Sequence, residues 1–357
     1  MADLRRGSEL LLHGPDGTAA LIQAAEGVSD ASLAQLSGLS GTAPLLVLTQ
    51  QRASTLGIPA AEPNREVVTL GTANLRAETV AELADPTTKP GPVPAEHLAP
   101  AAMAPDVEPL AEAAVALAKM ARLLPAVLIA PVRLSGDPAA WAAQHKLLAV
   151  SALDIAAYRY AAARALRIVA DARVPLAGAE NTRIVAFRPT DGGVEHLAIV
   201  IGSPALDQPV LTRLHSECFT GDLLGSLRCD CGDQLRGAIQ AIAEAGAGIL
   251  LYLAQEGRGI GLVNKLRAYD LQDRGADTFE ANEQLGFDAD ERVYLPAAEM
   301  LRRLGYQKIR LMTNNPDKVA GVVRYGITVA ERVAHSFPSN GHNELYLAAK
   351  ATRGHLI

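Results

Sequence analysis

Three cysteines dominate the chemistry available to this chain. Cys218, Cys229 and Cys231 are the only cysteines among its 357 residues. All three lie in the stretch RLHSECFTGDLLGSLRCDCGDQ, residues 213–234, among arginine, histidine and carboxylate side chains. Thiolates in such polar surroundings are typical zinc ligands, whereas cysteines that only fill space lie in apolar runs. The stretch therefore predicts a metal site, with zinc as the first candidate.

The number of ligands bears on what the metal does. A structural zinc is usually closed by four protein ligands, whereas a catalytic zinc keeps three and leaves one position for water. Without a fourth cysteine, a closed site would need a histidine or a carboxylate, and His215 is the nearest imidazole. We favour the open site and keep the closed one as the alternative. A disulfide fits poorly, because Cys229 and Cys231 are too close to pair easily and an odd count leaves one thiol over.

A second segment suited to ligand binding follows GILLYLAQ, an apolar run that predicts a buried strand. Glycines at 257, 259 and 261 let the backbone approach a ligand closely, and Arg258 supplies a fork of donors for a phosphate or a purine edge. Taken alone, this pattern also suits an ordinary tight turn between a strand and a helix. It gains weight only beside the cysteine stretch.

The wider pattern resembles a known enzyme family. RLHSECFTGDLLGSLRCDCGDQL is similar to the zinc-binding signature of GTP cyclohydrolase II, which opens the guanine imidazole ring at the start of riboflavin synthesis. The resemblance continues through AQEGRGIGLVNKLRAYDLQDRGADTFEANEQLGFDADERVY and LMTNNPDKV, so it covers roughly residues 168–357. It implies GTP as substrate, a zinc ion on the cysteines, Mg²⁺ on the triphosphate and a homodimer.

The resemblance also implies roles for individual residues. Asp290 would be the proton acceptor, Arg292 would act at the α-phosphate, and Tyr269 would orient the attacked purine atom or a proton. From the pattern alone, Tyr269 is equally well explained as a packing residue of an amphipathic helix. Arg292 is equally well explained as an electrostatic stabiliser, because a guanidinium is nearly always protonated and makes a poor covalent nucleophile. The implied GTP contacts are Arg213, Leu214, His215, Ser216, Glu217, Gln234, Glu256, Gly257, Arg258, Thr278, Thr313 and Lys318.

The implied reaction makes demands that these residues could meet. Water must add at C8 of the purine, and zinc lowers the pKa of a bound water to about 7. Three thiolates weaken that acidity, so nearby bases must contribute, with Tyr269 and Asp290 as candidates. Guanine presents N–H donors, which Glu217, Gln234 or Glu256 could accept.

The first half of the chain resembles another enzyme more faintly. LRRG, AAEGVSDASLAQL and EAAVALAKMARLLPAVLI are similar to fragments of 3,4-dihydroxy-2-butanone 4-phosphate synthase. That family holds magnesium and a sugar phosphate on an acidic loop, but here the stretch is HGPDGTAALIQ, with Asp16 as its only carboxylate. The family's metal-binding histidine position holds Leu110. A hard cation needs several converging oxygens, so we predict a degenerate, non-catalytic domain.

Length and patterning predict two domains of the α/β (α+β) class. A chain of 357 residues exceeds the usual size of a single core. We expect the synthase-like domain at residues 1–167 and the cyclohydrolase domain, with a mixed sheet and flanking helices, at 168–357. In the first half, residues 44–49 and 127–132 predict buried strands, and residues 18–39 predict helical stretches broken at a glycine. In the second half, IVADARVPL, TRIVAFRP and HLAIVIG predict an antiparallel sheet.

Composition limits the classes of partner. A net charge of -6 and an aromatic content of 4% disfavour nucleic-acid binding. We expect a cytoplasmic protein, since no apolar run reaches the length of a membrane span or of a signal-peptide core. His335, His342 and His355 match no role and are interpreted as surface histidines. Two alternatives to the enzyme remain, namely a zinc-stabilised GTP-binding regulator without turnover and a related cyclohydrolase that stops at the formyl intermediate.

Overall fold

The computed structural model describes residues 1–59, 65–88, 93, 95–335 and 341. Residue contacts divide the chain into two compact units that do not follow the order of the sequence. The first unit comprises Met1–Tyr158 and Val263–Glu291, and the second comprises Arg159–Leu262 and the residues from Arg292 onward. The segment Val263–Glu291, which belongs to the cyclohydrolase-like half of the sequence, therefore packs within the first unit.

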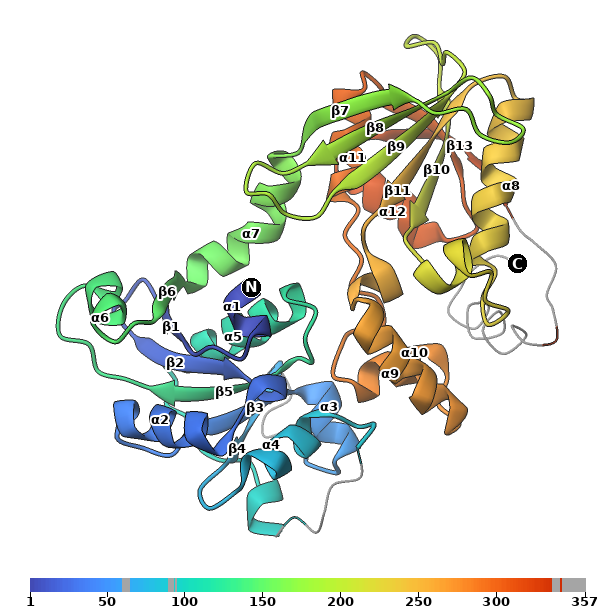
Figure 1. Cartoon of the computed structure of the whole chain (residues 1–357). Helices are drawn as coiled ribbons and strands as arrows, with labels where there is room; N and C mark the ends of the chain where they lie inside the picture. The colour runs from blue at the N-terminus through green and yellow to red at the C-terminus, as the bar shows by residue number, and fades with distance from the viewer. Residues whose placement is uncertain (60–64, 89–92, 94, 336–340, 342–357) are drawn as a thin grey trace. The chain divides into compact units, whose positions relative to one another are not determined.

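The first unit is built on a six-stranded sheet of order β4-β3-β5-β2-β1-β6 (Figure 1). Only the β1–β6 pair is parallel, and the other neighbours pair antiparallel. Helix α5 (Glu108–Met120) covers one face with Leu110, Ala114 and Leu117, which join the main core of this unit. The strands are β1 (Leu10–His13), β2 (Ala19–Ala24), β3 (Leu45–Thr49), β4 (Val67–Gly71), β5 (Ala126–Pro131) and β6 (Leu148–Ser151).

Of the elements predicted within residues 18–132, two strands and one helix are confirmed, and one helical stretch is wrong. Strands β3 and β5 occupy the two apolar runs that predicted strands, and α2 (Asp30–Ser40) forms where a helix was expected, with Ser29 closing a capping box. The expected helix over residues 18–24 is wrong, because Ala19–Ala24 is the buried strand β2 between β1 and β5. An alanine-rich apolar run without clear periodicity takes the conformation that pairing with its neighbours imposes.

The segment Val263–Glu291 contributes two helices to the first unit. They are α9 (Leu262–Asp273) and α10 (Thr278–Gln284). Asp277 caps α10 and forms a capping box with Glu280. The loop after α10 carries Gly286, whose φ of 90° is open to glycine but strained for other residues.

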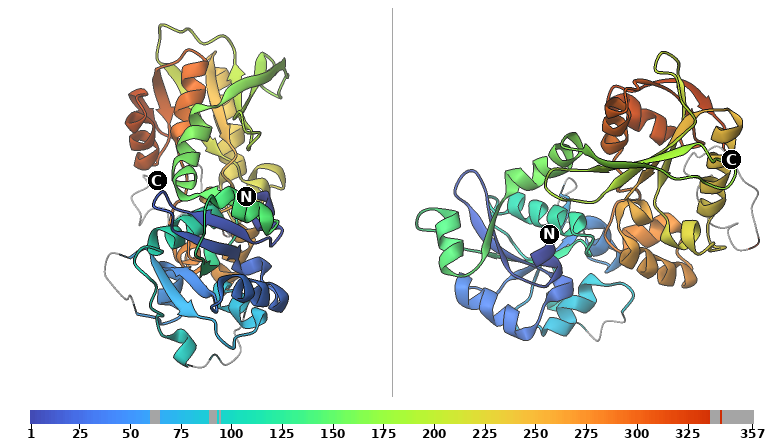
Figure 2. Two further views of the ribbon diagram at one scale, coloured as in Figure 1. Left: turned by 90° about the vertical axis from the view of Figure 1, so that its left-hand side faces the viewer. Right: turned by 45° about the horizontal axis from the view of Figure 1, so that its top comes forward.

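The second unit is built on a seven-stranded sheet of order β13-β12-β10-β11-β9-β8-β7 (Figure 1). Figure 2 shows this sheet from two further directions. Strands β7, β8 and β9 pair antiparallel as predicted, and β11 also pairs antiparallel with β9. Strands β11, β10, β12 and β13 pair parallel, so the sheet is mixed. The strands are β7 (Arg167–Arg173), β8 (Thr182–Arg188), β9 (His196–Ile201), β10 (Val210–Ser216), β11 (Gly248–Leu253), β12 (Lys308–Met312) and β13 (Thr328–Val333).

Helices flank this sheet on both faces. Helix α8 (Cys231–Glu244) buries Ala238 and Ile242 against one face, in a cluster with Leu211 and Leu250. Helices α11 (Leu295–Arg303) and α12 (Pro316–Arg324) pack into the separate core cluster of the same sheet. Because successive strand residues point to opposite faces, one sheet supports both clusters. The ends of β10 and β11 are thereby fixed, and the cysteine stretch begins there.

The remaining helical elements are short or peripheral. These elements are α1 (Ala2–Arg5), η1 (Ala25–Gly27), α3 (Gln50–Thr55), α4 (Ala77–Ala84), η2 (Ala95–Leu98), α6 (Pro138–Gln144), α7 (Ala152–Arg164), η3 (Phe219–Leu223) and η4 (Glu256–Gly259). Of all the described helices, none combines the length and the apolarity that crossing a bilayer requires.

Candidate metal centre and nucleotide site

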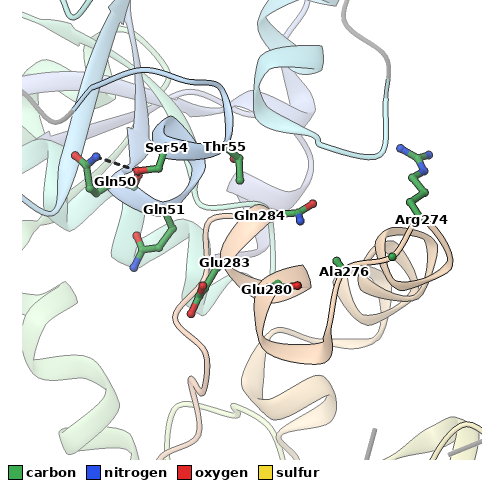
Figure 3. Close-up of a pocket in the computed structure, with 10 residues that line it drawn as sticks. Gln50, Gln51, Ser54, Thr55, Arg274, Ala276, Glu280, Glu283 and Gln284 are labelled. Carbon is green, nitrogen blue, oxygen red and sulfur yellow. Dashed lines mark hydrogen bonds between the residues drawn. The ribbon is translucent and has the colours of Figure 1, made fainter. Parts of the chain in front are cut away.

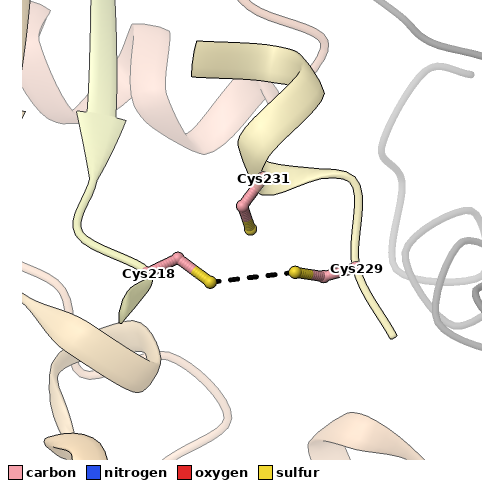
Figure 4. Close-up of side chains that lie close together, drawn as sticks. All are labelled: Cys218, Cys229 and Cys231. Atoms are coloured by element: carbon pink, nitrogen blue, oxygen red, sulfur yellow. Dashed lines mark hydrogen bonds between the residues drawn. The ribbon is translucent and has the colours of Figure 1, made fainter. Parts of the chain in front are cut away.

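The three cysteines converge in the second unit (Figure 4). Cys218 follows the end of β10, while Cys229 and Cys231 lie at the start of α8. Their Sγ atoms all lie within 4.8 Å of one another, and the Sγ atoms of Cys218 and Cys229 are 3.7 Å apart. Cys218 and Cys229 are buried. Among the described residues, this group contains no histidine or carboxylate ligand.

A glycine makes the convergence possible. A Cβ atom on Gly221 would lie 2.8 Å from the Sγ of Cys229, 2.9 Å from the Cβ of Cys231 and 3.1 Å from the Sγ of Cys218. Any side chain at this position would occupy the space between the thiols. The backbone of the short π-helical turn Phe219–Leu223 thus passes close to the three cysteines at Gly221.

The thiols are poorly suited to ionise without a cation. The hydrogen bond with Cys218 raises the pKa of Cys229 to about 11. Hydrogen bonds with the two other cysteines, followed by burial, raise the pKa of Cys231 well above its ordinary value. Sulfur atoms this close need a positive charge to become thiolates together, and a borderline-soft divalent cation supplies it. The donor set therefore fits a zinc ion.

Asp222 ties the cysteine loop to the sheet. Its carboxylate accepts from the Nε2 of His215 at 3.0 Å, from the hydroxyl of Tyr252 at 2.9 Å and from the backbone N–H of Cys218 at 3.0 Å. His215 and Tyr252 lie side by side on β10 and β11, with their rings stacked. Burial, followed by the charge of Asp222, raises the pKa of Tyr252. The Nε2 of His215, the nearest imidazole nitrogen considered for a closed site, is thus directed to a carboxylate.

A second chain of hydrogen bonds supports the Cys-Asp-Cys turn. Gln234 donates to the carboxylate of Asp230 at 2.5 Å and accepts from the guanidinium of Arg213. Arg213 also donates to the carbonyl of Met312 at 2.9 Å. Burial lowers the pKa of Arg213 to about 10, opposed by the charge of Asp230. These contacts connect the start of α8 to the ends of β10 and β12.

The glycine-rich segment packs against the cysteine loop. The carboxylate of Glu256, which is buried, accepts from the backbone N–H of Phe219 at 2.6 Å and from that of Gly257 at 2.9 Å. Gly257 and Arg258 both have left-handed backbone conformations, with φ of 61°. The strand-to-turn reading of EGRGIG is confirmed, because the segment follows β11 directly. Glu256 therefore joins this turn to the loop that carries Cys218.

The remaining predicted contacts of the second unit line the ends of the parallel strands. Lys318 is buried and donates to the carbonyl of Leu214 at 2.8 Å. Thr313 accepts from the backbone N–H of Asn315 at 3.0 Å. Gln255 donates to the hydroxyl of Ser216 at 3.2 Å. All of these side chains lie on segments that end at one edge of the sheet, and so do Arg213, His215, Glu217 and Arg258. Ligands of α/β proteins collect at such an edge.

Arg292 also belongs to the second unit. The next residue, Val293, donates its backbone N–H to the side chain of Gln255 at 3.3 Å. Gln255 therefore contacts both this loop and Ser216. The positive charge of Arg292 is close enough to that of Arg213 to lower its pKa further, after the larger effect of burial.

Three predicted site residues belong to the first unit instead. Tyr269 lies on α9, Thr278 is the first residue of α10, and Asp290 lies in the loop that follows. Tyr269 and Thr278 are half-buried, and Asp290 is exposed. The ammonium of Lys265 lies 5.7 Å from the centre of the Tyr269 ring.

The interpretation of His335 as a surface residue is wrong. It is buried, and its Nε2 donates to the carbonyl of Gln234 at 3.0 Å. Its backbone N–H and carbonyl exchange hydrogen bonds with the side chain of Asn314 at 3.0 and 3.1 Å. Burial lowers its pKa to about 4. His342 and His355 lie outside the described residues.

Sequence reasoning gave no role to several residues that organise the site. Asp222, Tyr252 and Gln255 fall in this class, together with His335. The only signal for Asp222 was its place among the charged residues around the cysteines. The others have no signal, because their partners lie on different strands.

Comparison with known proteins agrees with this geometry. A family model described as GTP cyclohydrolase II matches residues 167–334. The GTP cyclohydrolase-2 of Azospirillum brasilense is 56% identical over 358 residues, which cover 100% of this chain and 92% of that protein. The GTP cyclohydrolase-2 of Pseudomonas aeruginosa (strain LESB58) is 57% identical over 190 residues, which cover 53% of this chain and 92% of that protein.

Among solved structures, a two-domain 3,4-dihydroxy-2-butanone 4-phosphate synthase from A. baumannii aligns with 94% of this chain and 98% of its own. Its sequence identity is 17% and its TM-score is 0.38, a likeness too weak to bear on the fold. The relative from Azospirillum is similar over the whole chain, including the first half that the family model does not cover. The chain therefore belongs to the GTP cyclohydrolase II family.

Proposed function

We propose that this protein is a zinc-dependent GTP cyclohydrolase II, which catalyses the first step of riboflavin biosynthesis. It would convert GTP to 2,5-diamino-6-ribosylamino-4(3H)-pyrimidinone 5′-phosphate, formate and pyrophosphate. The observation that carries the proposal is the convergence of Cys218, Cys229 and Cys231 in a chain 56% identical to a named GTP cyclohydrolase-2 over its full length.

The three cysteines would hold one zinc ion per chain. With three protein ligands, a tetrahedral site keeps one position for water. When bound, zinc supplies a nucleophilic water at neutral pH, which the poorly electrophilic C8 of guanine requires. Asp222 and Glu256 keep the cysteine loop in place through its backbone N–H groups, so the thiols need little rearrangement to bind the metal.

Guanine recognition is proposed to rest on Glu217. The side chains of Gln234 and Glu256 accept hydrogen bonds from protein groups, so we assign them to holding the site together. Glu217 is half-buried at the end of β10, where its backbone N–H donates to Leu253 at 2.8 Å. A carboxylate there would accept from the N–H groups of guanine, and adenine would leave it unsatisfied at a cost of about 1–3 kcal/mol.

The triphosphate is proposed to meet the positive groups at the same edge of the sheet. Arg258 and Lys318 would neutralise the triphosphate together with Mg²⁺. The buried positive charge of Arg213 would add to this electrostatic stabilisation. Gly257 would let the backbone approach the phosphates. Leu214 and His215 would shape the floor, while Ser216, Thr278 and Thr313 would complete the contacts.

Three residues are proposed to act on the reacting atoms. Tyr269 would orient the attacked purine atom or a proton, and Asp290 would accept a proton. Arg292 would act at the α-phosphate, either as a nucleophile or by stabilising charge. The proximity of Arg292 to the charge of Arg213 supports a role at an anionic group.

The first half is proposed to be a degenerate synthase-like domain at residues 1–167, followed by the catalytic domain at 168–357. Leu110, at the metal-binding histidine position, is 1% exposed and packs in the core under α5. Asp16 lies in an exposed turn, where hydrogen bonds from Thr18 lower its pKa. Core packing accounts for Leu110, and hydrogen bonding within a turn accounts for Asp16, so neither position needs a metal ion.

We also propose a cytoplasmic homodimer. Reduced cysteines that bind metal are typical of a reducing compartment. The loop between Cys218 and Cys229 exposes large apolar side chains, which a second protomer would cover. These are Phe219, Leu223, Leu224 and Leu227.

The test is a GTP turnover assay on the purified full chain, with zinc content measured in parallel and formate and the pyrimidine followed separately. We expect stoichiometric zinc and both products in the native protein, and loss of both in Cys229→Ser. Bound GTP and full zinc without formate would instead indicate the regulatory protein without turnover. Formate without pyrophosphate, or a formylated pyrimidine, would indicate the related chemistry.

A further inference from the structure

The segment Val263–Glu291 carries three of the proposed active-site residues, Tyr269, Thr278 and Asp290, yet it packs within the first unit. We propose that the first 158 residues act as the scaffold that positions this segment for the cyclohydrolase reaction. The proposal rests on the proposed function for the roles of those three residues. It gives the synthase-like domain a part in the chemistry of the other half of the chain.

Arg267 is the centre of the attachment on α9. Its Nε donates to the carboxylate of Asp85 at 2.9 Å, and its Nη2 lies 2.5 Å from the Oε1 of Glu26. Its Nη1 donates to the side chain of Asn264 at 2.8 Å. The side chains of Arg267, Asp85 and Glu26 are largely buried, with exposed fractions of 21%, 15% and 19%. These pairs fix the orientation of the Arg267 side chain, because the two carboxylates come from different segments, η1 and the end of α4.

Helix α9 also forms a hydrogen bond with a backbone group of the first unit. Asn264 is fully buried and donates to the carbonyl of Arg122 at 3.0 Å. Arg122 has a left-handed φ of 59°, an uncommon conformation for a residue with a side chain. Glu26, besides pairing with α9, accepts from the backbone N–H of Leu124 at 3.0 Å. The turn 122–124 and α9 therefore share their polar partners.

The loop that carries Asp290 is attached by Lys119, which lies on α5. Its ammonium is 3.1 Å from the carboxylate of Asp288 and 2.6 Å from that of Glu291. The side chain of Glu291 is 6% exposed. Gln51 donates to the other oxygen of Asp288 at 3.0 Å. Asp290 thus lies between two carboxylates that are both held by one lysine.

The segment 263–291 packs closely against the first 158 residues at Gly286 and more openly beside α3. The hydroxyl of Thr49 donates to the carbonyl of Gly286 at 2.8 Å, deep in the unit. Beside it, an open pocket of about 800 Å³ lies between α3 and α10 (Figure 3). Most of the residues that line it have polar side chains, and they include Gln50, Gln51, Ser54, Arg274, Glu280 and Glu283. The segment buries apolar side chains such as Leu285 and Phe287, and specific polar contacts fix its orientation, so single substitutions at these contacts should loosen it.

The experiment compares Lys119 variants in the full chain. Lys119→Met keeps the length of the side chain but removes both ion pairs of the Asp290 loop. We expect kcat for GTP to fall about 10- to 100-fold, because a displacement of about 1 Å in a catalytic group costs this much. The KM should change less than kcat, and zinc stoichiometry should stay at the native value. Lys119→Arg should restore most of the activity.

Hydrogen exchange gives a readout that does not depend on turnover. Peptides from 263–291 should exchange faster in Lys119→Met than in the native chain, and near the native rate in Lys119→Arg. Glu26→Gln, at the other end of the attachment, should change exchange and kcat in the same direction. Arg76→Met is the matched control, since it breaks an exposed ion pair of the same unit, with Glu78, and should change neither quantity.

The outcomes separate the two proposals. Unchanged kcat and unchanged exchange in both Lys119→Met and Glu26→Gln would overturn the scaffold role. If the native chain with full zinc does not turn GTP over, the proposed function fails, and the exchange data still decide whether residues 1–158 hold the segment. Faster exchange with native kcat would also overturn the role in catalysis.

Discussion

The cysteine stretch 213–234 and the segment 263–291 both carry residues proposed for the reaction, but they are held in different ways. The cysteine stretch is supported by strands and loops of its own unit, through Asp222, Gln234 and Glu256. The segment is supported by residues far away in the sequence, with separations of 169 residues for Lys119 and Asp288 and 182 for Asp85 and Arg267. A continuous family signature can therefore contain parts whose positions depend on different regions of the protein.

Each region also contains a glycine at a position where a side chain has no room. Gly221 leaves room for the three sulfur atoms, and Gly286 lets its loop approach Thr49 and Pro125. Substituting one glycine at a time tests whether the two regions are as independent as their contacts indicate.

Gly221→Ala should have the largest effect. Its Cβ would lie 2.8 Å from the Sγ of Cys229, so the thiols could no longer converge. We expect zinc affinity to fall about 10- to 100-fold or more, as when groups that support a zinc ligand are changed. Competition with a chromophoric chelator measures it. Exchange in peptides from 263–291 should stay native, and a change there would contradict the independence of the two regions.

Gly286→Ala should have the opposite pattern. Its Cβ would lie 2.7 Å from the Oγ1 of Thr49 and 2.9 Å from Pro125, at a φ of 90°. Overpacking of this kind costs about 1–3 kcal/mol. Thermal unfolding should show the loss of stability, and kcat should fall while zinc stoichiometry is retained. Loss of zinc in this variant would show that the segment also supports the metal site.

His335→Gln should change the pH dependence of stability. Burial lowers the pKa of His335 from 6.5 to about 4 in the folded protein, next to the positive charge of Arg213. The unfolded chain therefore takes up the proton first, and the native protein loses stability as pH falls from 6.5 toward 4. The variant should lose less stability over this interval, measured by urea unfolding at several pH values. An unchanged pH profile would remove His335 from the groups that destabilise the site in acid.

Gly38→Ala should have the smallest effect and serves as the control for both glycine variants. Gly38 lies inside α2, and a Cβ there would contact nothing within 4 Å. Alanine in a helix interior should raise stability by about 0.5–1 kcal/mol. Zinc content and kcat should be native. A loss of either would indicate that glycine substitutions disturb this protein generally.

Much of the fold could be predicted because its signals are local. The antiparallel strands of the second half and strands β3 and β5 follow apolar runs bounded by turn residues. The strand Ala19–Ala24 was missed because its alanine-rich sequence suits a helix until it is paired on both sides. His335 was missed because the partners that bury it, Gln234 and Asn314, follow from the tertiary structure.

The sequence by itself determined the family, the three thiols and the residue types of the nucleotide site, because these depend on chemistry encoded in short contiguous stretches. Only the tertiary structure decided which side chains hold the thiols and the nucleotide-site residues in place. The carboxylate of Asp222 accepts hydrogen bonds from His215, Tyr252 and the backbone of Cys218, because neighbouring strands bring these groups together. Likewise, the polar partners of 263–291 lie on strands, helices and turns of residues 1–158, and the segment belongs to the first unit. Long-range pairing of this kind depends on folded geometry, which local sequence patterns do not encode.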